Sequence, residues 1–405
     1  MAGLTATSLQ WLLDILVGGV LLAWLVLFFG RGYFWRADQR LPALPPASLA
    51  DKQASPACLP AVVAIVPARN EAEGIGPCVS ALLGQHYPGT LRVMLVDDQS
   101  TDGTADIAQA AAESISAAGR LQILAGKALP EGWAGKVWAM HQGVAAAGDA
   151  PLLWFTDADI VHGPDVLEKL VLHQQRDNRA LVSLMVMLSC RSFWERLLIP
   201  PFIFFFQMLY PFPWVNDRRR PLAGAAGGCM LLRRDLLLQA GGFAAMRGAL
   251  IDDCTLAALM KKQGPIWLGL GTESHSLRDY RFLDEIWRMV TRSAYVQLQF
   301  SPWRLLEATL GMIFLYALPV VMLVAGLVLP QWLWIAPSGL ALGLMAWAYA
   351  PSVRLYALNG LWVLTLPVAA MLYTLMTLDS ARRHYLGRGG AWKGRHYDQS
   401  GEKRP

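Results

Sequence analysis

The chain has 405 residues, of which 55% are hydrophobic and 16% are charged, and its formal net charge is +5. A soluble protein of this length carries closer to a quarter charged residues, so this composition excludes a fully soluble chain and predicts that part of it lies in lipid. The small positive charge suits a protein beside an anionic bilayer or one that handles phosphates. The sequence contains no basic stripe with interleaved aromatic residues, so it does not predict a nucleic-acid partner.

The N-terminal region contains an apolar run, WLLDILVGGVLLAWLVLFFG at residues 11–30, with the single charge Asp14. A membrane span needs about 20 apolar residues, so we expect a transmembrane anchor at residues 1–30. A cleaved signal peptide is the alternative, but it requires a positive N-terminal region, and the first ten residues hold no Lys or Arg. Three arginines follow the run directly: Arg31, Arg36 and Arg40. The positive-inside rule therefore predicts that the chain after residue 30 is cytosolic.

The rest of the chain divides by composition into a linker at 31–60, a globular domain at 61–300, an apolar region at 301–378 and a basic tail at 379–405. The apolar region holds three long runs. One anchor plus three further spans would place the tail outside, whereas its Lys and Arg content predicts a cytosolic tail. Either one run is re-entrant or interfacial, or the charge rule fails here; we favour the cytosolic tail.

Within the globular domain, the stretch LLIPPFIFFFQMLYPFPWV at residues 197–215 is cut by four prolines. No uninterrupted piece is long enough to span a bilayer. Its aromatic density is typical of an interfacial segment, where aromatic rings lie at headgroup depth. The alternative is a core segment of the globular domain.

Four apolar runs in the globular domain predict buried strands: residues 61–67, 91–98, 121–126 and 151–159. Segments with helical spacing separate them near residues 74–85, 103–118 and 136–147. Strands that alternate with helices predict βαβ units and a doubly wound α/β sheet. In such sheets ligands bind beyond the carboxyl ends of the strands.

Polar residues follow three of these strands, at PARNE (67–71), Asp97–Asp98 and the D-x-D pair Asp157 and Asp159. A lone D-x-D is as readily a solvated loop, but these carboxylates converge on one crevice. Carboxylates gathered in one place repel each other unless a cation lies between them. Oxygen ligands without a nearby His or Cys favour Mg²⁺ or Mn²⁺, which commonly bind through two carboxylates and substrate phosphates.

Two further motifs fit a phosphate-containing substrate. GWAGKVWA (132–139) places Lys136 at the start of a helix in a Gly-rich turn, where backbone N–H groups and the ammonium both attract phosphate. An ordinary helix start with a solvated lysine is the alternative. IDDCTLAALMKKQG (251–264) places Asp252 and Asp253 at a helix N-terminus. Helix capping explains one aspartate, and the second is a candidate general base for an acceptor hydroxyl.

Six motifs together resemble the membrane-anchored family 2 glycosyltransferases of the GT-A fold, a Rossmann-like nucleotide-sugar domain. They occur in the family's order over about residues 61–265: PARNE, VDDQSTDGT, GWAGK, TDAD, AGAAGGCMLLRRD and IDDC. Stretches such as GALIDDC and RSAYVQLQFSP are similar to the hopene-associated glycosyltransferases of bacterial hopanoid clusters.

The resemblance implies a role for each matching residue. Nucleotide-sugar binding is carried to Pro67, Arg69, Asn70, Glu71, Asp98, Lys136 and Asp157. Asp159, with Asp157, would ligate the divalent metal; Asp253 would be the catalytic base, with Asp252 beside it. Gly227 and Gly228 would lie on the acceptor side. The reaction implied is an inverting transfer from a nucleoside-diphosphate sugar to a membrane lipid, at the cytosolic face of a bacterial inner membrane.

The acceptor side departs from the family pattern. Members that extend polysaccharides usually carry Q/R-x-x-R-W after the base, and RMVTRSAY (288–295) has an extra residue between Arg288 and Arg292 and no Trp. Both arginines remain candidates for a phosphate contact. A non-catalytic scaffold of a lipid-synthesis complex and a transporter are the competing hypotheses. A transporter is disfavoured because no repeated halves are present.

Overall fold

The computed structural model describes residues 6–44, 59–386, 391–392 and 395–396, which fall into two compact units. The helical unit comprises Met1–Ala37, Cys190–Pro213 and Tyr280–Gly389; the sheet unit comprises Asp38–Ser189, Trp214–Asp279 and Gly390–Pro405. This division differs from the domain boundaries expected from composition, because residues 190–213 and 280–300 pack with the apolar helices. Of the expected linker at 31–60 and basic tail at 379–405, residues 45–58, 387–390, 393–394 and 397–405 lie outside the described part.

The sheet unit is built on an eight-stranded sheet with the order β3-β2-β1-β4-β7-β6-β8-β5. The strands are β1 Val62–Ala68, β2 Leu91–Asp97, β3 Leu121–Ala125, β4 Leu152–Phe155, β5 Ile160–His162, β6 Leu181–Met187, β7 Met230–Arg233 and β8 Ile266–Ser276. Strands β1 to β4 are parallel to one another, as the alternation of strands and helices predicts. β7 runs antiparallel between β4 and β6, and β5 runs antiparallel to β8.

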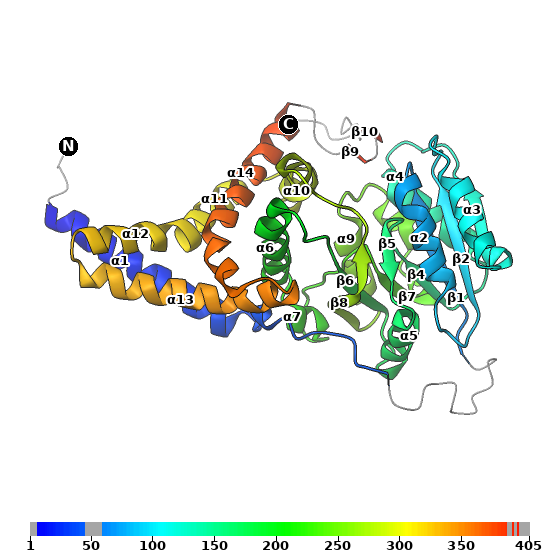
Figure 1. Cartoon of the computed structure of the whole chain (residues 1–405), viewed down its shortest axis with the longest axis horizontal. Coiled ribbons are helices and arrows are strands. Elements are labelled where there is room, and N and C mark those ends of the chain that lie inside the picture. The colour runs from blue at the N-terminus through cyan, green and yellow to red at the C-terminus, as the bar shows by residue number, and fades with distance from the viewer. Residues whose placement is uncertain (1–5, 45–58, 387–390, 393–394, 397–405) are drawn as a thin grey trace. The chain divides into compact units, whose positions relative to one another are not determined.

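Helices lie along the sheet in Figure 1. They are α2 Ala72–Leu83, α3 Thr104–Ser114, α4 Gly135–Ala146, α5 Val166–Arg176, α8 Arg234–Gln239 and α9 Asp252–Lys261, and α7 Phe212–Asn216 falls at a boundary between the units. Alternate residues of a strand point to opposite faces. Val62 and Ala64 accordingly pack with α2, whereas a Cβ on Gly143 of α4 would lie 2.6 Å from Ile65. Helices therefore cover both faces of the sheet, which is a doubly wound arrangement.

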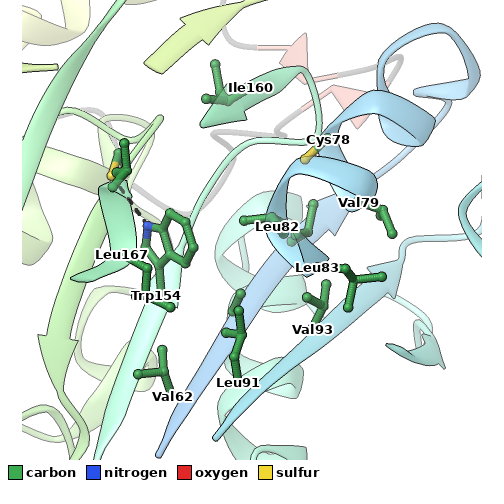
Figure 2. Packing of buried hydrophobic residues seen from close by; sticks show 14 of the residues in the cluster. Val62, Cys78, Val79, Leu82, Leu83, Leu91, Val93, Trp154, Ile160 and Leu167 are labelled. Atoms are coloured by element: carbon green, nitrogen blue, oxygen red, sulfur yellow. Dashed lines mark hydrogen bonds between the residues drawn. The ribbon is translucent and has the colours of Figure 1, made fainter. Parts of the chain in front are cut away.

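The core of the sheet unit lies between α2 and the strands. Figure 2 shows Leu82 of α2 near Val62, Leu91 and Val93, with Trp154 of β4 on the adjacent strand. Trp154 is fully buried, and its Nε1 donates to the Cys229 thiol at 3.4 Å. This packing fixes the carboxyl ends of β1, β2 and β4 at one edge of the sheet.

The helical unit contains the apolar helices and the amphipathic helix α10. Its helices are α1 Ala6–Leu25, α6 Phe193–Leu209, α10 Leu283–Gln297, α11 Pro302–Met312, α12 Leu318–Val328, α13 Trp332–Leu355 and α14 Leu366–Tyr385. Among the described residues, four helical stretches are long and apolar enough to cross a membrane: Gln10–Gly30, Pro302–Val328, Trp332–Leu355 and Gly360–Tyr385. The chain therefore has an N-terminal and three C-terminal apolar helices that suggest membrane anchoring.

The stretch at 197–215 is not broken at Pro200 and Pro201, through which α6 continues, but α6 ends at Leu209, just before Pro211. A capping box starts the helix: the Ser192 hydroxyl accepts from the Glu195 N–H, and the Glu195 carboxylate accepts from the Ser192 N–H. Much of α6 is buried against the other helices of this unit, with Phe204 fully buried. The alternative of a core segment is thus the closer description, although the core is that of the helical unit.

Candidate active site

The first two polar loops of the sheet edge are laced together by side-chain hydrogen bonds. Pro67 and Ala68 pair with Val96 and Asp97 at the ends of β1 and β2. The side-chain oxygen of Asn70 accepts from the Thr101 backbone N–H at 2.9 Å. The backbone N–H of Asn70 donates to the Ser100 hydroxyl at 3.0 Å. These contacts hold residues 69–71 and 98–104 as one rigid loop pair.

Asp98 lies at the base of this loop pair and is fully buried. Its N–H donates to the Ala68 carbonyl at 2.8 Å, and Arg69 donates to the Asp98 carbonyl at 2.6 Å. The Arg69 guanidinium is also 3.8 Å from the Asp98 carboxylate, so the buried charge is paired. Pro67, Arg69, Asn70 and Asp98, four of the predicted nucleotide-binding residues, therefore share one end of the sheet.

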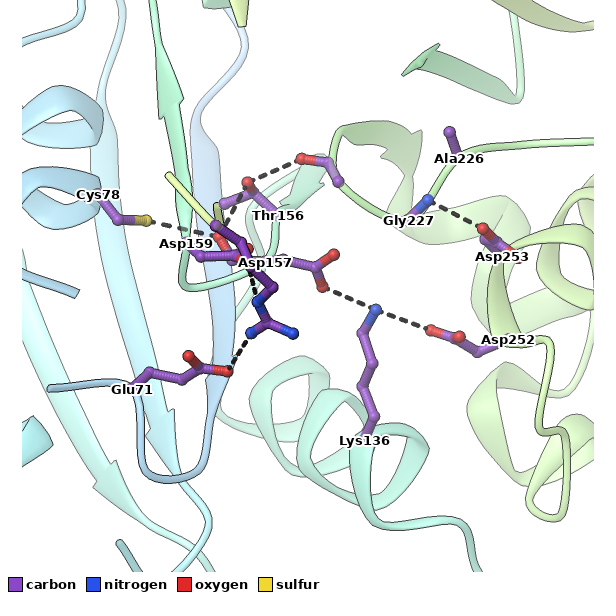
Figure 3. Close-up of polar contacts among 12 residues, drawn as sticks. Glu71, Cys78, Lys136, Thr156, Asp157, Asp159, Ala226, Gly227, Asp252 and Asp253 are labelled. Atoms are coloured by element: carbon purple, nitrogen blue, oxygen red, sulfur yellow. Dashed lines mark hydrogen bonds and ion pairs between the residues drawn. The ribbon is translucent and has the colours of Figure 1, made fainter. Parts of the chain in front are cut away.

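Lys136, at the second residue of α4, connects two carboxylates that are distant in sequence. Its Nζ lies 2.7 Å from Asp157 Oδ1 and 3.3 Å from Asp252 Oδ2, as Figure 3 shows. Burial lowers the pKa of Lys136, but the two aspartates raise it by more, so the ammonium stays charged at neutral pH. The D-x-D turn and the predicted base motif are thus joined through one cation.

Asp253 is held by two backbone donors. Its Oδ2 accepts from the Gly227 N–H at 3.0 Å and its Oδ1 from the Cys254 N–H at 2.7 Å (Figure 3). Burial, followed by the neighbouring Asp252 charge, raises the pKa of Asp253 to about 6. A carboxyl with this pKa is ionised at neutral pH and more basic than an exposed aspartate, as a general base requires.

The Gly-rich loop leaves the space that this arrangement needs. A Cβ on Gly227 would lie 3.2 Å from Lys136 Nζ, and a Cβ on Gly228 would lie 3.0 Å from Val186. Both predicted glycines therefore fit the site by lacking a side chain: Gly227 leaves room for the lysine, and Gly228 for packing against β6.

The second aspartate of the D-x-D has a partner that sequence reasoning missed. Arg278 Nε lies 3.2 Å from Asp159 Oδ2, and its NH2 nitrogen lies 3.4 Å from Glu71 Oε1. Burial raises the pKa of Asp159, and Asp157 and Glu71 raise it further, whereas Arg278 opposes them. The counter-charges in this structure are thus two side-chain cations, Lys136 and Arg278.

The donor set fits a divalent cation that shares its coordination with a substrate. Five carboxylates (Glu71, Asp157, Asp159, Asp252 and Asp253) face these two side-chain cations, so the cluster keeps an excess of negative charge. Asp157 and Asp159 supply the oxygen ligands that Mg²⁺ and Mn²⁺ prefer. No group of three or more His, Cys, Asp or Glu in the described part of the chain is arranged to hold a metal. The cation's other ligands would therefore come from water and phosphate.

The two predicted acceptor-side arginines belong to the helical unit. Arg288 and Arg292 are exposed on α10 of the helical unit, and Arg288 pairs with Asp284 one turn earlier on the same helix. The sheet unit thus brings together Lys136, Asp157, Asp159, Asp252 and Asp253 with Glu71 and Gly227, and it does not contain the arginine pair.

Comparison with known proteins agrees with this geometry. Residues 63–240 match the family model described as Glycosyl transferase family 2. Glycosyltransferase AglE of Haloferax volcanii is 35% identical over 102 residues, which are 25% of this chain and 31% of the relative. The chain thus matches about a third of the length of that relative.

Solved structures with a similar chain course include two sugar-transferring enzymes. The mannosyltransferase PcManGT from Pyrobaculum calidifontis, in complex with GDP-Man and Mn²⁺, is 18% identical and aligns over 89% of this chain and 99% of its own, with a TM-score of 0.49. Glucosyl-3-phosphoglycerate synthase from Mycobacterium tuberculosis is 19% identical over 64% of this chain and 87% of its own, with a TM-score of 0.41. Residues 63–240, which include Lys136 and the D-x-D pair, thus match the glycosyltransferase family 2 model.

Proposed function

We propose that the protein transfers a sugar from a nucleoside-diphosphate sugar to a hydroxyl group of a membrane lipid, with inversion at the anomeric carbon. The observation that carries the proposal is the bridge of Lys136 between Asp157 and Asp252, with Asp253 held by the Gly227 N–H. It joins a diphosphate-binding group to a buried base within one cluster. The family match supports the same reaction class.

Each residue of the cluster has a defined part in this reaction. Asp253 accepts the proton of the acceptor hydroxyl as its oxygen attacks the anomeric carbon, and the bond to the diphosphate breaks on the opposite side. The Lys136 ammonium stabilises the negative charge that develops on the departing diphosphate. A divalent cation held by Asp157 and Asp159, when bound, supplies further positive charge to that leaving group.

A membrane lipid is the acceptor class that the apolar helices support, because an enzyme anchored in the bilayer meets its lipid there at high local concentration. The resemblance to the hopene-associated enzymes makes a hopanoid the first acceptor to test. The three arginines after the N-terminal helix support a cytosolic sheet unit in a bacterial inner membrane.

The test is release of nucleoside diphosphate by the purified full chain in detergent. UDP- and GDP-sugars are offered with Mn²⁺ or Mg²⁺, with and without a bacterial lipid extract that contains hopanoids. We expect lipid-dependent release by the wild type and a loss of about 10²–10⁴-fold in Asp253→Asn, the usual contribution of a general base. Asp235→Asn, an exposed aspartate in the first turn of α8, is the matched control and should stay active.

Two results would count against the proposal. Equal release by the wild type and Asp253→Asn would show that Asp253 is not the general base. If nucleoside diphosphate release were the same with and without lipid for every donor, the scaffold hypothesis would be favoured. The anomeric configuration of the product, read by NMR, tests inversion separately.

A further inference from the structure

Arg278 is placed beside the D-x-D turn by backbone pairing as well as by its side chain. Ile160 of β5 pairs with Ser276 of β8, and the next N–H, that of Leu277, donates to the Asp159 carbonyl at 2.8 Å. This bond fixes the chain that carries Arg278 against Asp159. The backbone position of Arg278 therefore follows from the sheet, while its side chain sets where the guanidinium lies.

The guanidinium lies against one oxygen of the carboxylate that the expected metal would use. Arg278 Nε lies 3.2 Å from Asp159 Oδ2, while its NH2 nitrogen lies 3.4 Å from Glu71. Mg²⁺ and Mn²⁺ bind carboxylate oxygens at about 2.0–2.2 Å, so a cation on the Asp159 carboxylate would share its negative charge with the guanidinium and repel it. Asp159 therefore cannot serve both at full strength.

The arginine side chain is the most exposed of the three groups in this contact. Its side chain is 39% exposed, whereas the side chains of Asp159 and Glu71 are each 17% exposed. Arg278 also lies beyond the end of β8, at the polar edge of the sheet. Of the groups in this contact, the arginine is the one whose displacement disturbs the core least.

We propose that Arg278 is an exchangeable counter-ion: it neutralises Asp159 and Glu71 in the metal-free protein and yields Asp159 to the divalent cation when the nucleotide loads. Its guanidinium, released from Asp159, then pairs with the diphosphate, for which its fork of N–H donors is suited. The inference rests on the proposed function, because it takes Asp159 as a metal ligand. In this role Arg278 positions the nucleotide-sugar donor, and between turnovers it stabilises the carboxylate cluster.

The prediction has opposite signs with and without nucleotide. The probe is Mn²⁺, followed by the EPR signal of the free ion, with the purified full chain in detergent. With Mn²⁺ alone, Arg278→Gln should bind the ion up to about fivefold more tightly than the wild type, the range that one partly exposed ion pair supplies. With saturating Mn²⁺, the same variant should bind UDP or GDP more weakly by a similar factor. Arg278→Lys keeps the charge and should stay near the wild type with Mn²⁺ alone, but it lacks the fork of N–H donors and should bind UDP or GDP more weakly with saturating Mn²⁺.

Two further variants make the result specific. Lys169→Gln breaks an ion pair to Glu273, on the same strand β8, and should change neither affinity. Asp159→Asn should abolish the tight Mn²⁺ binding in both the wild-type and the Arg278→Gln background. The midpoint of thermal unfolding checks that Arg278→Gln is folded. It is measured without metal and again with Mn²⁺, which should restore it to the wild-type value.

Unchanged or weaker binding of Mn²⁺ alone by Arg278→Gln would overturn the inference and leave the transferase proposal to the release assay. The absence of Asp159-dependent Mn²⁺ binding in every variant would overturn both the inference and the metal assignment. Lipid-dependent release could still be observed in that case, so the two failures are distinguishable.

Discussion

Asp253 combines burial with an adjacent carboxylate, and both make its proton harder to remove. Burial is the larger cause, the charge of Asp252 is the second, and together they raise the pKa of Asp253 to about 6 although Lys136 opposes them. A base is active only when it is unprotonated. Activity is therefore present above this pKa and is lost as the pH falls through it.

The acid limb of the pH profile follows from this shift. We expect kcat for nucleoside diphosphate release to fall below pH 6 by about tenfold per pH unit, as for a single required deprotonation. Asp252→Asn removes the neighbouring negative charge and should move the midpoint to lower pH. Activity recovered on return to neutral pH excludes denaturation, and a rate that is flat between pH 7 and 5 would contradict the assignment of Asp253.

A buried polar network connects the D-x-D turn to the Gly-rich loop at the level of the strands. The Thr156 hydroxyl donates to the Gly228 carbonyl at 2.9 Å and contacts His162 Nε2 at 2.8 Å. The other ring nitrogen of His162 contacts the Ser274 hydroxyl of β8 at 2.8 Å. Burial lowers the pKa of His162 to about 3, so the ring is neutral, and with Thr156 donating to Gly228, Nε2 carries the proton.

Removal of one hydroxyl tests what this network contributes. Thr156→Val keeps the shape but leaves the His162 N–H and the Gly228 carbonyl unsatisfied, which costs about 1–3 kcal/mol. We expect a lower midpoint of thermal unfolding and weaker Mn²⁺-dependent nucleotide binding, because Asp157 is the next residue. Thr156→Ser retains the hydroxyl and should recover most of both. Equal midpoints for the two variants would show that the network adds no stability.

Many of the helices and strands could be predicted from the sequence. The strands that carry Asp98 and Asp157 are short apolar runs between helical segments, and both lie where that pattern predicts. Helix α6 was harder, because two adjacent prolines normally end a helix, whereas here burial of Pro200 and Pro201 offsets the lost hydrogen bonds. Local sequence rules do not include that packing term.

Arg278 could not be predicted for a different reason. Its place beside Asp159 depends on the antiparallel pairing of β5 with β8, a contact between segments far apart in sequence. The sequence around it, SLRDYRF, contains no spacing that would mark one arginine over the other. Glu71, Asp157 and Asp159 could be predicted because each follows a strand, but the arginine that pairs with two of them follows from the register of the sheet.

At the scale of the whole molecule, the helical unit shows how the apolar helices are directed. Trp334 of α13 donates to Asp14 of α1 at 2.6 Å, and Trp347 packs edge-on to Phe28, so these two helices run in the same direction. The segment from α11 to α12 runs the opposite way, since Trp24 donates to the Leu315 carbonyl and Val17 packs with Met322. Residues 30 and 355 thus lie at the same end of this bundle.

Helix α14 does not return through the bundle. It lies crosswise to α1, α12 and α13 in Figure 1 and packs against α6 and α10. The Tyr373 hydroxyl donates to the Leu198 carbonyl of α6, and the Ser380 hydroxyl donates to the Thr291 carbonyl of α10, the helix that precedes α11. Both ends of α14 are therefore at the end of the bundle that holds residue 30. If α14 lies along the interface, the expected cytosolic tail is compatible with four long apolar helices.

We predict three crossings and one helix along the interface, with Leu386 at the end of α14 on the same side as Arg31. In sealed inverted membrane vesicles, we expect protease to remove a C-terminal tag without added detergent. Gln331→Cys, in the turn between α12 and α13, should react with an impermeant maleimide only from the opposite side. A tag that is cut only in right-side-out vesicles would show that α14 spans the bilayer.

The contact between Asp14 and Trp334 has a consequence for how the protein is made. These residues are 320 positions apart, and Trp24 is 291 positions from its partner Leu315. At 5–20 residues per second, α1 waits roughly 15–60 s after its own synthesis before these partners leave the ribosome. During that interval Asp14 has lipid or the translocon around it, at a cost of about 2.5–3.5 kcal/mol if it lies near the bilayer centre. The apolar remainder of α1 must therefore hold the helix in the membrane unaided, and the late arrival of α13 then locks an anchor that was already in place.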